Sequence, residues 1–167
     1  MKGIQFKRAK MPENAVSTEM DLIVAADAAK NVKVVGAWGR FRLKEGGFSC
    51  QHIIGRALLA DEDSNIPKNE LDALAIGSNL GWILRQALVQ WVSSYILIGD
   101  STIALSWVSS EKKRLSLFHR NRCVQIRRGT ELDVLYHVVS DCNPCDIATR
   151  PEAVKDSDVG PSSNWEK

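Results

Sequence analysis

A short apolar run that ends in a carboxylate is the feature that most constrains this chain. The run spans residues 95–99 and stops at Asp100, which Ser101 and Thr102 follow. A continuous apolar run is typical of a buried strand in a parallel or mixed sheet, and functional groups gather just beyond the carboxyl ends of such strands. Asp100 is therefore a candidate site residue. An acid before Ser and Thr is also an ordinary helix start, so this interpretation needs support from the rest of the chain.

A second apolar run, residues 22–26, also ends in a carboxylate, Asp27. Residues 32–43 are rich in strand-forming residues and partly alternate, and the pair Gly46-Gly47 supplies a turn before residues 48–59. This pattern predicts a β-hairpin. The short connections predict three antiparallel strands, of which the first carries Asp27.

The longest helical pattern follows at residues 68–92, after Pro67, which suits a first helical turn. Glu70 lies in the first turn of this predicted helix, where an acid can simply stabilise the helix end. Gly77 and Gly81 predict close approach to a neighbouring element. Apolar residues at three- and four-residue steps predict one broad face packed on a sheet, formed by Ile76, Leu80, Ile83, Leu84, Ala87, Leu88 and Trp91.

The remaining pattern predicts helices at residues 101–110 and near 115–127, then a strand at 132–139. A helix start follows at residues 143–150, with Asp146 in its first turn. Four acids thus stand at strand ends or helix starts: Asp27, Glu70, Asp100 and Asp146.

Length and composition favour one globular domain, since 167 residues are too few for two comfortable ones and 44% hydrophobic with 25% charged residues is ordinary. We expect an arm or linker at residues 1–20, the domain at 21–150 and a flexible tail at 151–167. Because we find neither a bilayer-spanning apolar stretch nor a secretory signal, we expect no membrane association and an intracellular protein with reduced cysteines. Cys142 and Cys145 have the spacing of half a zinc or redox motif, but no second pair supports it.

Basic residues concentrate at residues 111–128, where Phe118 and His119 are interleaved and Glu111 is the lone acid. This density suits contacts to a phosphate backbone, although a solvated helix face has the same composition. The candidate nucleic-acid-binding residues are Lys112, Lys113, Arg114, Arg120 and Arg122. Four tryptophans are expected to pack in the core or the hairpin rather than to stack on bases: Trp38, Trp82, Trp91 and Trp107.

The order and spacing of the four acids resembles the ribonuclease H domain of long-terminal-repeat retrotransposon polyproteins, most closely the BEL/Pao type. The blocks that carry the resemblance are ADAA at 26–29, IPKNELDAL at 66–74, GDSTIALSW at 99–107 and NPCDIATR at 143–150. The likeness covers roughly residues 20–150. Each block alone is a weak signal, and four in order make a more specific one.

This resemblance implies an α/β ribonuclease H-like fold: a five-stranded mixed sheet, three antiparallel strands then two parallel ones, flanked by helices. It also implies two Mg²⁺ or Mn²⁺ ions, since hard oxygen ligands favour such cations. Asp27 would bridge both ions and Asp100 would be the other central ligand, while Glu70 and Asp146 would each bind one ion.

Many members of the family have a mobile histidine in the loop before the last helix. In this chain Asp141 stands near the expected place of that histidine. His137 lies earlier, within the predicted strand, and we interpret it as structural. The missing histidine puts the turnover rate in doubt more than the chemistry.

The activity implied by the resemblance is hydrolysis of the RNA strand of RNA–DNA hybrids by a metal-dependent endonuclease during reverse transcription. The implied partner is the reverse transcriptase domain of the same polyprotein, in the cytoplasm within virus-like particles. Two alternatives stay open. One is a domesticated or structural domain that binds nucleic acid or a reverse transcriptase without independent activity. The other is a different enzyme on the same scaffold, such as an integrase, resolvase or exonuclease.

Overall fold

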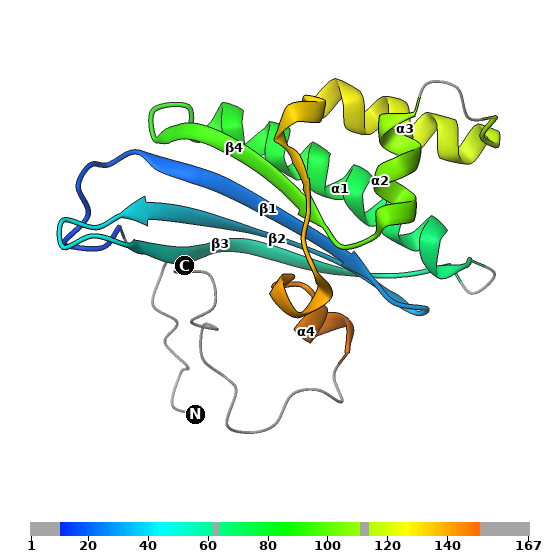
Figure 1. Cartoon of the computed structure of the whole chain (residues 1–167), viewed down its shortest axis with the longest axis horizontal. Helices are drawn as coiled ribbons and strands as arrows, with labels where there is room; N and C mark the ends of the chain where they lie inside the picture. Colours follow the sequence, from blue (N-terminus) through cyan, green and yellow to red (C-terminus); the bar gives the residue numbers. More distant parts are fainter. Residues whose placement is uncertain (1–10, 62–63, 111–113, 151–167) are drawn as a thin grey trace, which may run out of the picture.

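A five-stranded mixed sheet forms the centre of the protein. The computed structural model describes residues 11–61, 64–110 and 114–150. The strands are β1 (Met20–Ala28), β2 (Val32–Arg42), β3 (Phe48–Leu59), β4 (Val92–Gly99) and β5 (Leu135–His137). Their order is β3-β2-β1-β4-β5; the pairs β3–β2 and β2–β1 are antiparallel, and β1–β4 and β4–β5 are parallel (Figure 1). The predicted sheet is therefore confirmed.

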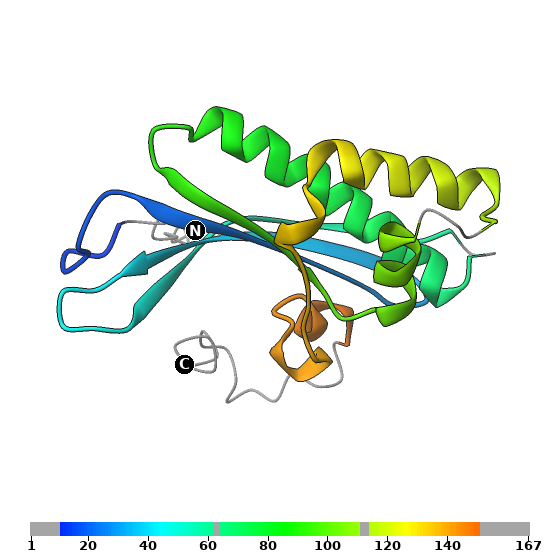
Figure 2. The same ribbon diagram turned by 45° about the horizontal axis from the view of Figure 1, so that its top comes forward.

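Helices cover both faces of this sheet unequally. The helices are α1 (Ile66–Ala87), α2 (Thr102–Ser109), α3 (Leu117–Gly129) and α4 (Asp146–Thr149), with 3₁₀ turns η1 (Leu132–Val134) and η2 (Ser140–Cys142). The first three lie on one face, and α4 lies on the other (Figures 1 and 2). The last helix of the described residues therefore reaches the sheet from the side opposite α1.

The predicted hairpin is confirmed, because β2 and β3 pair along their length and the turn between them holds Gly46 and Gly47 at φ of 90° and 77°. These are left-handed backbone angles, which glycine adopts without a steric penalty. The predicted long helix ends earlier than expected: the N–H of Leu88 donates to the carbonyl of Leu84, and the chain then turns into β4. Residues 88–92 therefore do not belong to the helix.

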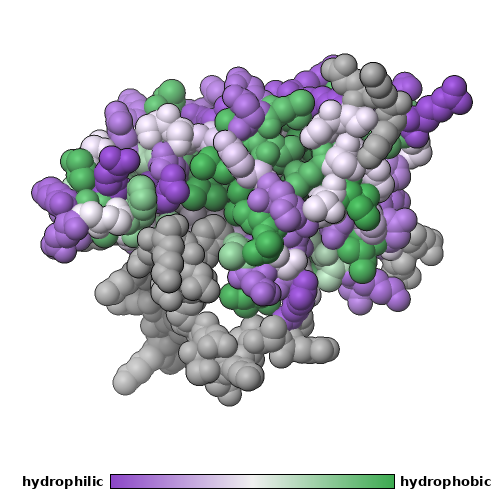
Figure 3. Space-filling model, viewed as in Figure 1, coloured by the Kyte–Doolittle hydropathy of each residue, from purple (hydrophilic) through white to green (hydrophobic). Residues whose placement is uncertain are grey.

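The predicted strand at 132–139 is wrong in extent. Residues 132–134 form η1, and β5 pairs with β4 over three residues only, from Leu135 to His137. Because β5 reaches only the end of β4, residues 92–96 of β4 have no strand on that side within the described part of the chain. Figure 3, in the same view as Figure 1, shows apolar residues gathered near the middle of the visible surface, around β4, with hydrophilic residues around them.

The face of α1 that packs on the sheet agrees only in part with the predicted one. Ile76, Leu80 and Leu84 are partly buried and pack against the core, as predicted. Ile83, Trp82 and Trp91 are 47%, 49% and 45% exposed, so the inclusion of Ile83 in that face and the core assignment of these two tryptophans are wrong. Besides the polar Asn69 and Asp72, the buried positions of α1 are Leu71, Leu74 and a series of small residues, Ala73, Ala75, Gly77, Ser78 and Gly81. Small side chains allow the helix to lie close to its neighbours.

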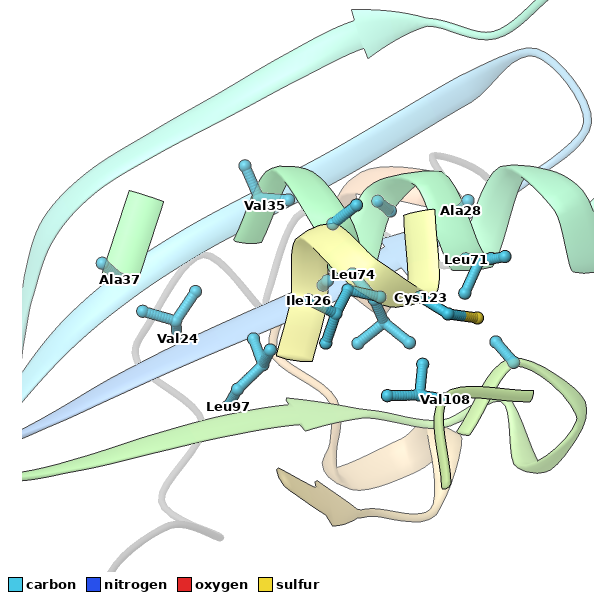
Figure 4. Packing of buried hydrophobic residues seen from close by; sticks show 14 of the residues in the cluster. Val24, Ala28, Val35, Ala37, Leu71, Leu74, Leu97, Val108, Cys123 and Ile126 are labelled. Atoms are coloured by element: carbon cyan, nitrogen blue, oxygen red, sulfur yellow. The ribbon is translucent and has the colours of Figure 1, made fainter. Parts of the chain in front are cut away.

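Glycine positions show how close this approach is. A Cβ at Gly77 would lie 3.2 Å from Cδ1 of Leu97 in β4, and one at Gly81 would lie 2.4 Å from Oη of Tyr95. The predicted role of both glycines is thus confirmed. Figure 4 shows Leu71 and Leu74 beside apolar side chains of the sheet and of α2 and α3, among them Leu97.

Buried ionic contacts join α1 to its neighbours. The carboxylate of Asp72 in α1 pairs with Nζ of Lys33 in β2 at 2.7 Å and with Nε of Arg122 in α3 at 2.5 Å. Asp72 and Lys33 are each 7% exposed. Removing one member of such a group leaves uncompensated charge in the interior, so this triad links the three elements.

A second ionic contact lies at the start of β1. Asp21 accepts from Arg40 at 2.8 Å and from Ser94 at 2.5 Å, joining β1 to β2 and β4. Burial raises the pKa of Asp21, but these hydrogen bonds and the charges of Arg40 and Arg42 outweigh it, so the pKa lies below its usual value. The ionised form of Asp21 is therefore favoured in the folded state.

Ala15 forms an isolated bridge with Leu43, which ties part of the segment before β1 to the hairpin. Residues 1–10 of the predicted arm and the predicted tail at 151–167 lie outside the described residues. None of the described helices combines the length and the apolarity that crossing a membrane would require.

Candidate functional site

Three of the four predicted acids line one cavity of about 230 Å³. Asp27 is near the end of β1, Asp100 directly follows β4, and Glu70 projects from α1. Because β1 and β4 are parallel neighbours, their carboxyl ends meet at one edge of the sheet. The structure therefore brings Asp27, Glu70 and Asp100 together at this edge.

Glu70 is held by contacts that fix the start of α1. Asn65 caps the helix by accepting from the N–H of Lys68, and since the helix starts at Ile66, Glu70 lies beyond the first turn in which it was predicted. Asn69 is 1% exposed, and its amide donates to the carbonyls of Ala29 and Lys30 at 3.2 Å each. The start of α1 is thereby tied to the turn that follows Asp27.

The helix-capping role considered for Asp100 belongs to its neighbour. Ser101 is the N-cap of α2, since its Oγ accepts from the N–H of Ala104 at 3.2 Å. The same hydroxyl donates to Oε2 of Glu70 at 2.5 Å. Asp100 is thus not needed to cap α2, and its carboxylate lines the cavity.

Asp146 reaches the same edge from the other face of the sheet, as the first residue of α4. Asn143 is 3% exposed; its amide donates to the carbonyl of Ala26 at 3.1 Å and accepts from the N–H of Cys145 at 3.2 Å. The thiol of Cys145 donates to the carbonyl of Ala25 at 3.3 Å. These contacts hold α4 against the end of β1, immediately before Asp27.

The end of α4 contacts two of the acids. Thr149 donates a hydrogen bond to Oδ2 of Asp27, and Nη2 of Arg150 lies 2.9 Å from Oδ1 of Asp146. Both residues also line the cavity. We assigned neither of them a role from sequence, although the acid–base spacing of four residues in a helical segment is a signal that could have identified Arg150.

Electrostatic repulsion among the acids is visible in their pKa values. Burial raises the pKa of Asp27, the charges of Asp100 and Asp146 raise it further, and the hydrogen bond from Thr149 only partly opposes them. Burial also raises the pKa of Glu70, with Asp100 and Asp27 adding to the shift. For Asp146, burial and repulsion from Asp100 raise the pKa, although the charge of Arg150 lowers it. The four acids therefore form one negatively charged site.

A preformed ion site is absent from the described part of the chain, where no three His, Cys, Asp or Glu side chains are grouped closely enough to hold a metal ion. Several carboxylates are engaged by protein groups instead: Asp27 by Thr149, Glu70 by Ser101 and Asp146 by Arg150. The donor set nevertheless fits a hard divalent cation, because carboxylate oxygens surround a cavity in which negative charge is incompletely compensated.

Two further residues discussed from sequence lie close to the acids. His137 is exposed on β5, and its Nε2 is 3.2 Å from the backbone carbonyl oxygen of Asp100. Asp141 is exposed in η2, and its charge contributes to the raised pKa of Asp146. No histidine is among the cavity-lining residues of the described part.

The structure describes only part of the predicted basic segment, and the described arginines differ in their exposure. Lys112 and Lys113 lie outside the described residues, whereas Arg114 and Arg120 are exposed. Arg122 is partly buried, and its guanidinium contacts Asp72 and the side chain of Gln125. Its charge is thus already partnered within the fold.

An aromatic–basic contact adjoins this segment at the start of α1. Nζ of Lys68 lies 4.7 Å from the ring centroid of Phe118, and the guanidinium carbon of Arg122 lies 5.2 Å from the same centroid. Lys68 precedes Glu70 by only two residues. Basic charge is therefore present on the same helix end that carries one of the acids.

All four cysteines are free, as expected. Cys142 is exposed, whereas the thiol of Cys145 is buried and bonded to the carbonyl of Ala25. Burial and the nearby charge of Asp27 raise the pKa of Cys145 to about 12. A thiol in that state is a poor metal ligand or nucleophile, which speaks against the zinc and redox interpretations.

Comparison with known proteins identifies the fold. Neither protein-family models nor curated protein sequences match the chain. Among solved structures, a ribonuclease H1 isolated from compost by a metagenomic approach matches with a TM-score of 0.52 and 15% identity over 82% of this chain and 97% of that one. At this identity the match establishes a ribonuclease H-like fold.

Two further solved structures give weaker matches. The N-terminal ribonuclease H domain of a Mycobacterium tuberculosis protein has a TM-score of 0.47 and 12% identity, covering 81% of this chain and all of that one (100%). Ribonuclease H1 of the halophilic archaeon Halobacterium salinarum has a TM-score of 0.41 and 14% identity, covering 72% and 86%.

Proposed function

We propose that this domain is a metal-dependent endonuclease that hydrolyses the RNA strand of RNA–DNA hybrids. The observation that carries the proposal is the gathering of Asp27, Glu70 and Asp100 around one cavity, with Asp146 delivered to the same edge by α4. Carboxylates that raise one another's pKa destabilise the fold unless something compensates their charge. A divalent cation bound among the carboxylates would compensate their negative charge.

In this proposal, the four carboxylates hold two Mg²⁺ or Mn²⁺ ions, with Asp27 and Asp100 as the central ligands and Glu70 and Asp146 at the sides. When bound, such ions promote attack by water on phosphorus and stabilise the leaving oxygen. The protein's own part is orientation: Ser101 directs Glu70, Thr149 directs Asp27, and Asn143 keeps Asp146 at the sheet edge.

Substrate binding is proposed for the basic segment that follows α2. A hybrid would be bound through its shape, its phosphates and its 2′-hydroxyl groups, without reading of bases. Lys112, Lys113, Arg114 and Arg120 are the candidates we retain for phosphate contacts. Arg122 is a weaker candidate than the sequence indicated, because it already pairs with Asp72.

The biological setting is also a proposal. The four sequence blocks support a retrotransposon polyprotein, in which the domain would act beside a reverse transcriptase during reverse transcription, in the cytoplasm within virus-like particles. The arm at 1–20 and the tail at 151–167 would then be linkers to neighbouring parts of such a chain.

A cleavage assay tests the proposal. The full chain is incubated with end-labelled RNA–DNA hybrid, duplex DNA or single strands, each with Mg²⁺, Mn²⁺ or EDTA. We expect cleavage of the RNA strand of the hybrid only with metal, lost in Asp27→Asn and Asp100→Asn and retained in the control Asp133→Asn, which alters an exposed acid in η1. Metal-dependent cleavage of DNA instead would show another enzyme on this scaffold.

One observation favours the alternative of a binding domain without independent activity: Asp27, Glu70 and Asp146 all have protein partners, and the described residues hold no preformed ion site. Calorimetric titration with Mn²⁺ separates the two. Binding that disappears in Asp27→Asn supports the enzyme, whereas hybrid binding without any Mn²⁺ binding supports the alternative.

A further inference from the structure

We propose that Arg150 is a substrate-binding residue that holds a phosphate of the nucleic acid at the mouth of the acidic cavity, and that its ion pair with Asp146 is the resting position of this arginine. The inference rests on the proposed function, because it requires a nucleic-acid strand to enter the cavity. It adds a residue and an exchange of partners that the sequence blocks did not assign.

The position of Arg150 is the first argument. It follows the last residue of α4 and lines the same cavity as Asp27, Glu70 and Asp100. It is the one cationic residue among the cavity-lining residues in the described part of the chain. A phosphodiester that approaches this site meets several carboxylates and would be repelled unless positive charge stands beside them. Arg150 supplies such charge where the strand must enter.

The second argument is that Arg150 can leave its present partner easily. Its side chain is 59% exposed, whereas that of Asp146 is 15% exposed. On the arginine side, water screens the pair and Arg150 loses side-chain freedom by forming it, which limits what the pair contributes to stability. The pair therefore holds Arg150 only weakly. Oδ1 of Asp146 is buried and loses this contact when the guanidinium turns outward, so the phosphate contact has to outweigh that loss.

The third argument concerns the shape and charge of the guanidinium. It carries five N–H donors in a planar fork that matches two oxygens of a phosphate, and pairs of this kind are stronger than single hydrogen bonds. The contact with Asp146 joins Nη2 to one carboxylate oxygen, Oδ1. A bidentate phosphate contact would thus replace a weaker one, and Asp146 would be released at the moment the substrate arrives.

The backbone supports this position of the residue. The N–H of Arg150 donates to the carbonyl of Asp146 at 3.0 Å, and the preceding Thr149 is buried and bonded to Asp27. The Cα of Arg150 is therefore fixed beside the acids, although its side chain is exposed. A long side chain on a fixed base suits a residue that changes partners.

Equilibrium binding of a labelled RNA–DNA hybrid in EDTA, where no cleavage occurs, tests the inference. Affinity is measured over a series of salt concentrations for wild type, Arg150→Ala, Asp146→Asn and the double variant. We expect Arg150→Ala to weaken binding roughly tenfold and to lower the slope of log affinity against log salt by about one, as the loss of one phosphate contact does. Arg56→Ala, which removes an exposed arginine of β3, is the matched control and should leave the slope unchanged.

The Asp146→Asn background separates a phosphate contact from a role that is confined to Asp146. Asp146→Asn alone should bind the hybrid more tightly than wild type, because the competing carboxylate is gone. If Arg150 contacts phosphate, Arg150→Ala in that background still lowers both affinity and slope. If Arg150 serves only to neutralise Asp146, Arg150→Ala has no effect once Asp146 is uncharged, and the inference is overturned.

Two further outcomes are distinguishable. If the wild-type protein cleaves hybrid, and Arg150→Ala binds hybrid with the same slope of log affinity against log salt as wild type, the inference is overturned and the proposed function stands. A wild-type protein that neither binds nor cleaves hybrid overturns both. Arg150→Lys, which keeps the charge without the planar fork, should keep the slope and recover only part of the affinity; recovery of neither would contradict a phosphate contact.

Discussion

Replacement of Asn143 by alanine should release α4 from the sheet without unfolding the domain. The Asn143 side chain is buried and joins two backbone groups, the carbonyl of Ala26 and the N–H of Cys145. In Asn143→Ala both hydrogen bonds are lost, and both backbone groups are left without this partner when α4 stays docked. The cost falls on the docked state of α4, because the sheet and α1–α3 do not depend on this side chain.

The size of the effect follows from those two contacts. Each hydrogen bond contributes about 1 kcal/mol net, and a buried group left unpaired costs about 1–3 kcal/mol. We therefore expect docking of α4 to weaken by about 2–4 kcal/mol. Since about 1.4 kcal/mol corresponds to a factor of ten, the undocked fraction should rise at least about 30-fold.

The thiol of Cys145 reports this fraction directly. It is 1% exposed, and its pKa is raised to about 12 in the docked state, so alkylation requires undocking. In a Cys142→Ser background, the rate of alkylation at Cys145 is followed by mass spectrometry. Cys123, 2% exposed in the main core, serves as an internal reporter of global unfolding.

We expect Asn143→Ala to accelerate alkylation of Cys145 by the stated factor while the rate at Cys123 stays nearly constant. Asn121→Ala, at an exposed position of α3, is the control and should change neither rate. Equal acceleration at both cysteines would refute the reasoning, because α4 would then be part of one cooperative unit. An unchanged rate at Cys145 would refute the role of Asn143 itself.

Three other changes test the packing that positions the site. Gly81→Ala should lower the urea midpoint, because overpacking against Tyr95 costs about 1–3 kcal/mol and exceeds the gain in helix propensity of up to about 1 kcal/mol; a higher midpoint would contradict the close approach. Asp72→Ala should destabilise the fold by about 3–5 kcal/mol, measured by thermal denaturation, because two cations lose their buried partner; an unchanged midpoint would contradict the triad. Because the pKa of Asp21 is lowered in the folded state, the stability advantage of wild type over Asp21→Asn should be full above the ordinary value of 3.8 and disappear as the pH falls through the lowered pKa. Urea titrations at several pH values measure this advantage, and a difference that persists in strong acid would contradict the assignment.

The hairpin, the first three antiparallel strands and the helix that follows Asp100 could be predicted from local sequence patterns, whereas the complete five-stranded mixed sheet was implied by the family resemblance. Alternation, the Gly46-Gly47 pair and apolar runs that end in acids are visible without any tertiary contact. The buried face of α1 could not be predicted in the same way. Ile83 and Trp91 were assigned to the packing face but are exposed, whereas Gly77 and Gly81 lie against β4, and this choice depends on how close the neighbouring elements come.

In the candidate site, too, some residues could be predicted from sequence and others could not. The four acids could be proposed from their order along the chain, but the groups that contact them could not. Ser101, Thr149 and Arg150 meet their carboxylate partners only after the chain has folded, and each is common in roles that involve no acid. Likewise, the sequence around Arg122 is typical of a surface cation, but in the folded protein Arg122 pairs with Asp72.

The placement of α4 on the far face of the sheet has a consequence for the synthesis of this protein on the ribosome. β5 ends at His137, so the whole sheet and the α1–α3 layer are encoded before Asn143 and Asp146. The sheet and the α1–α3 layer are therefore synthesised while the negatively charged edge still lacks its last member and the arginine beside it. If the proposed function holds, the ability to cut nucleic acid is gained last, because a product that stops before residue 143 lacks Asp146 and Arg150.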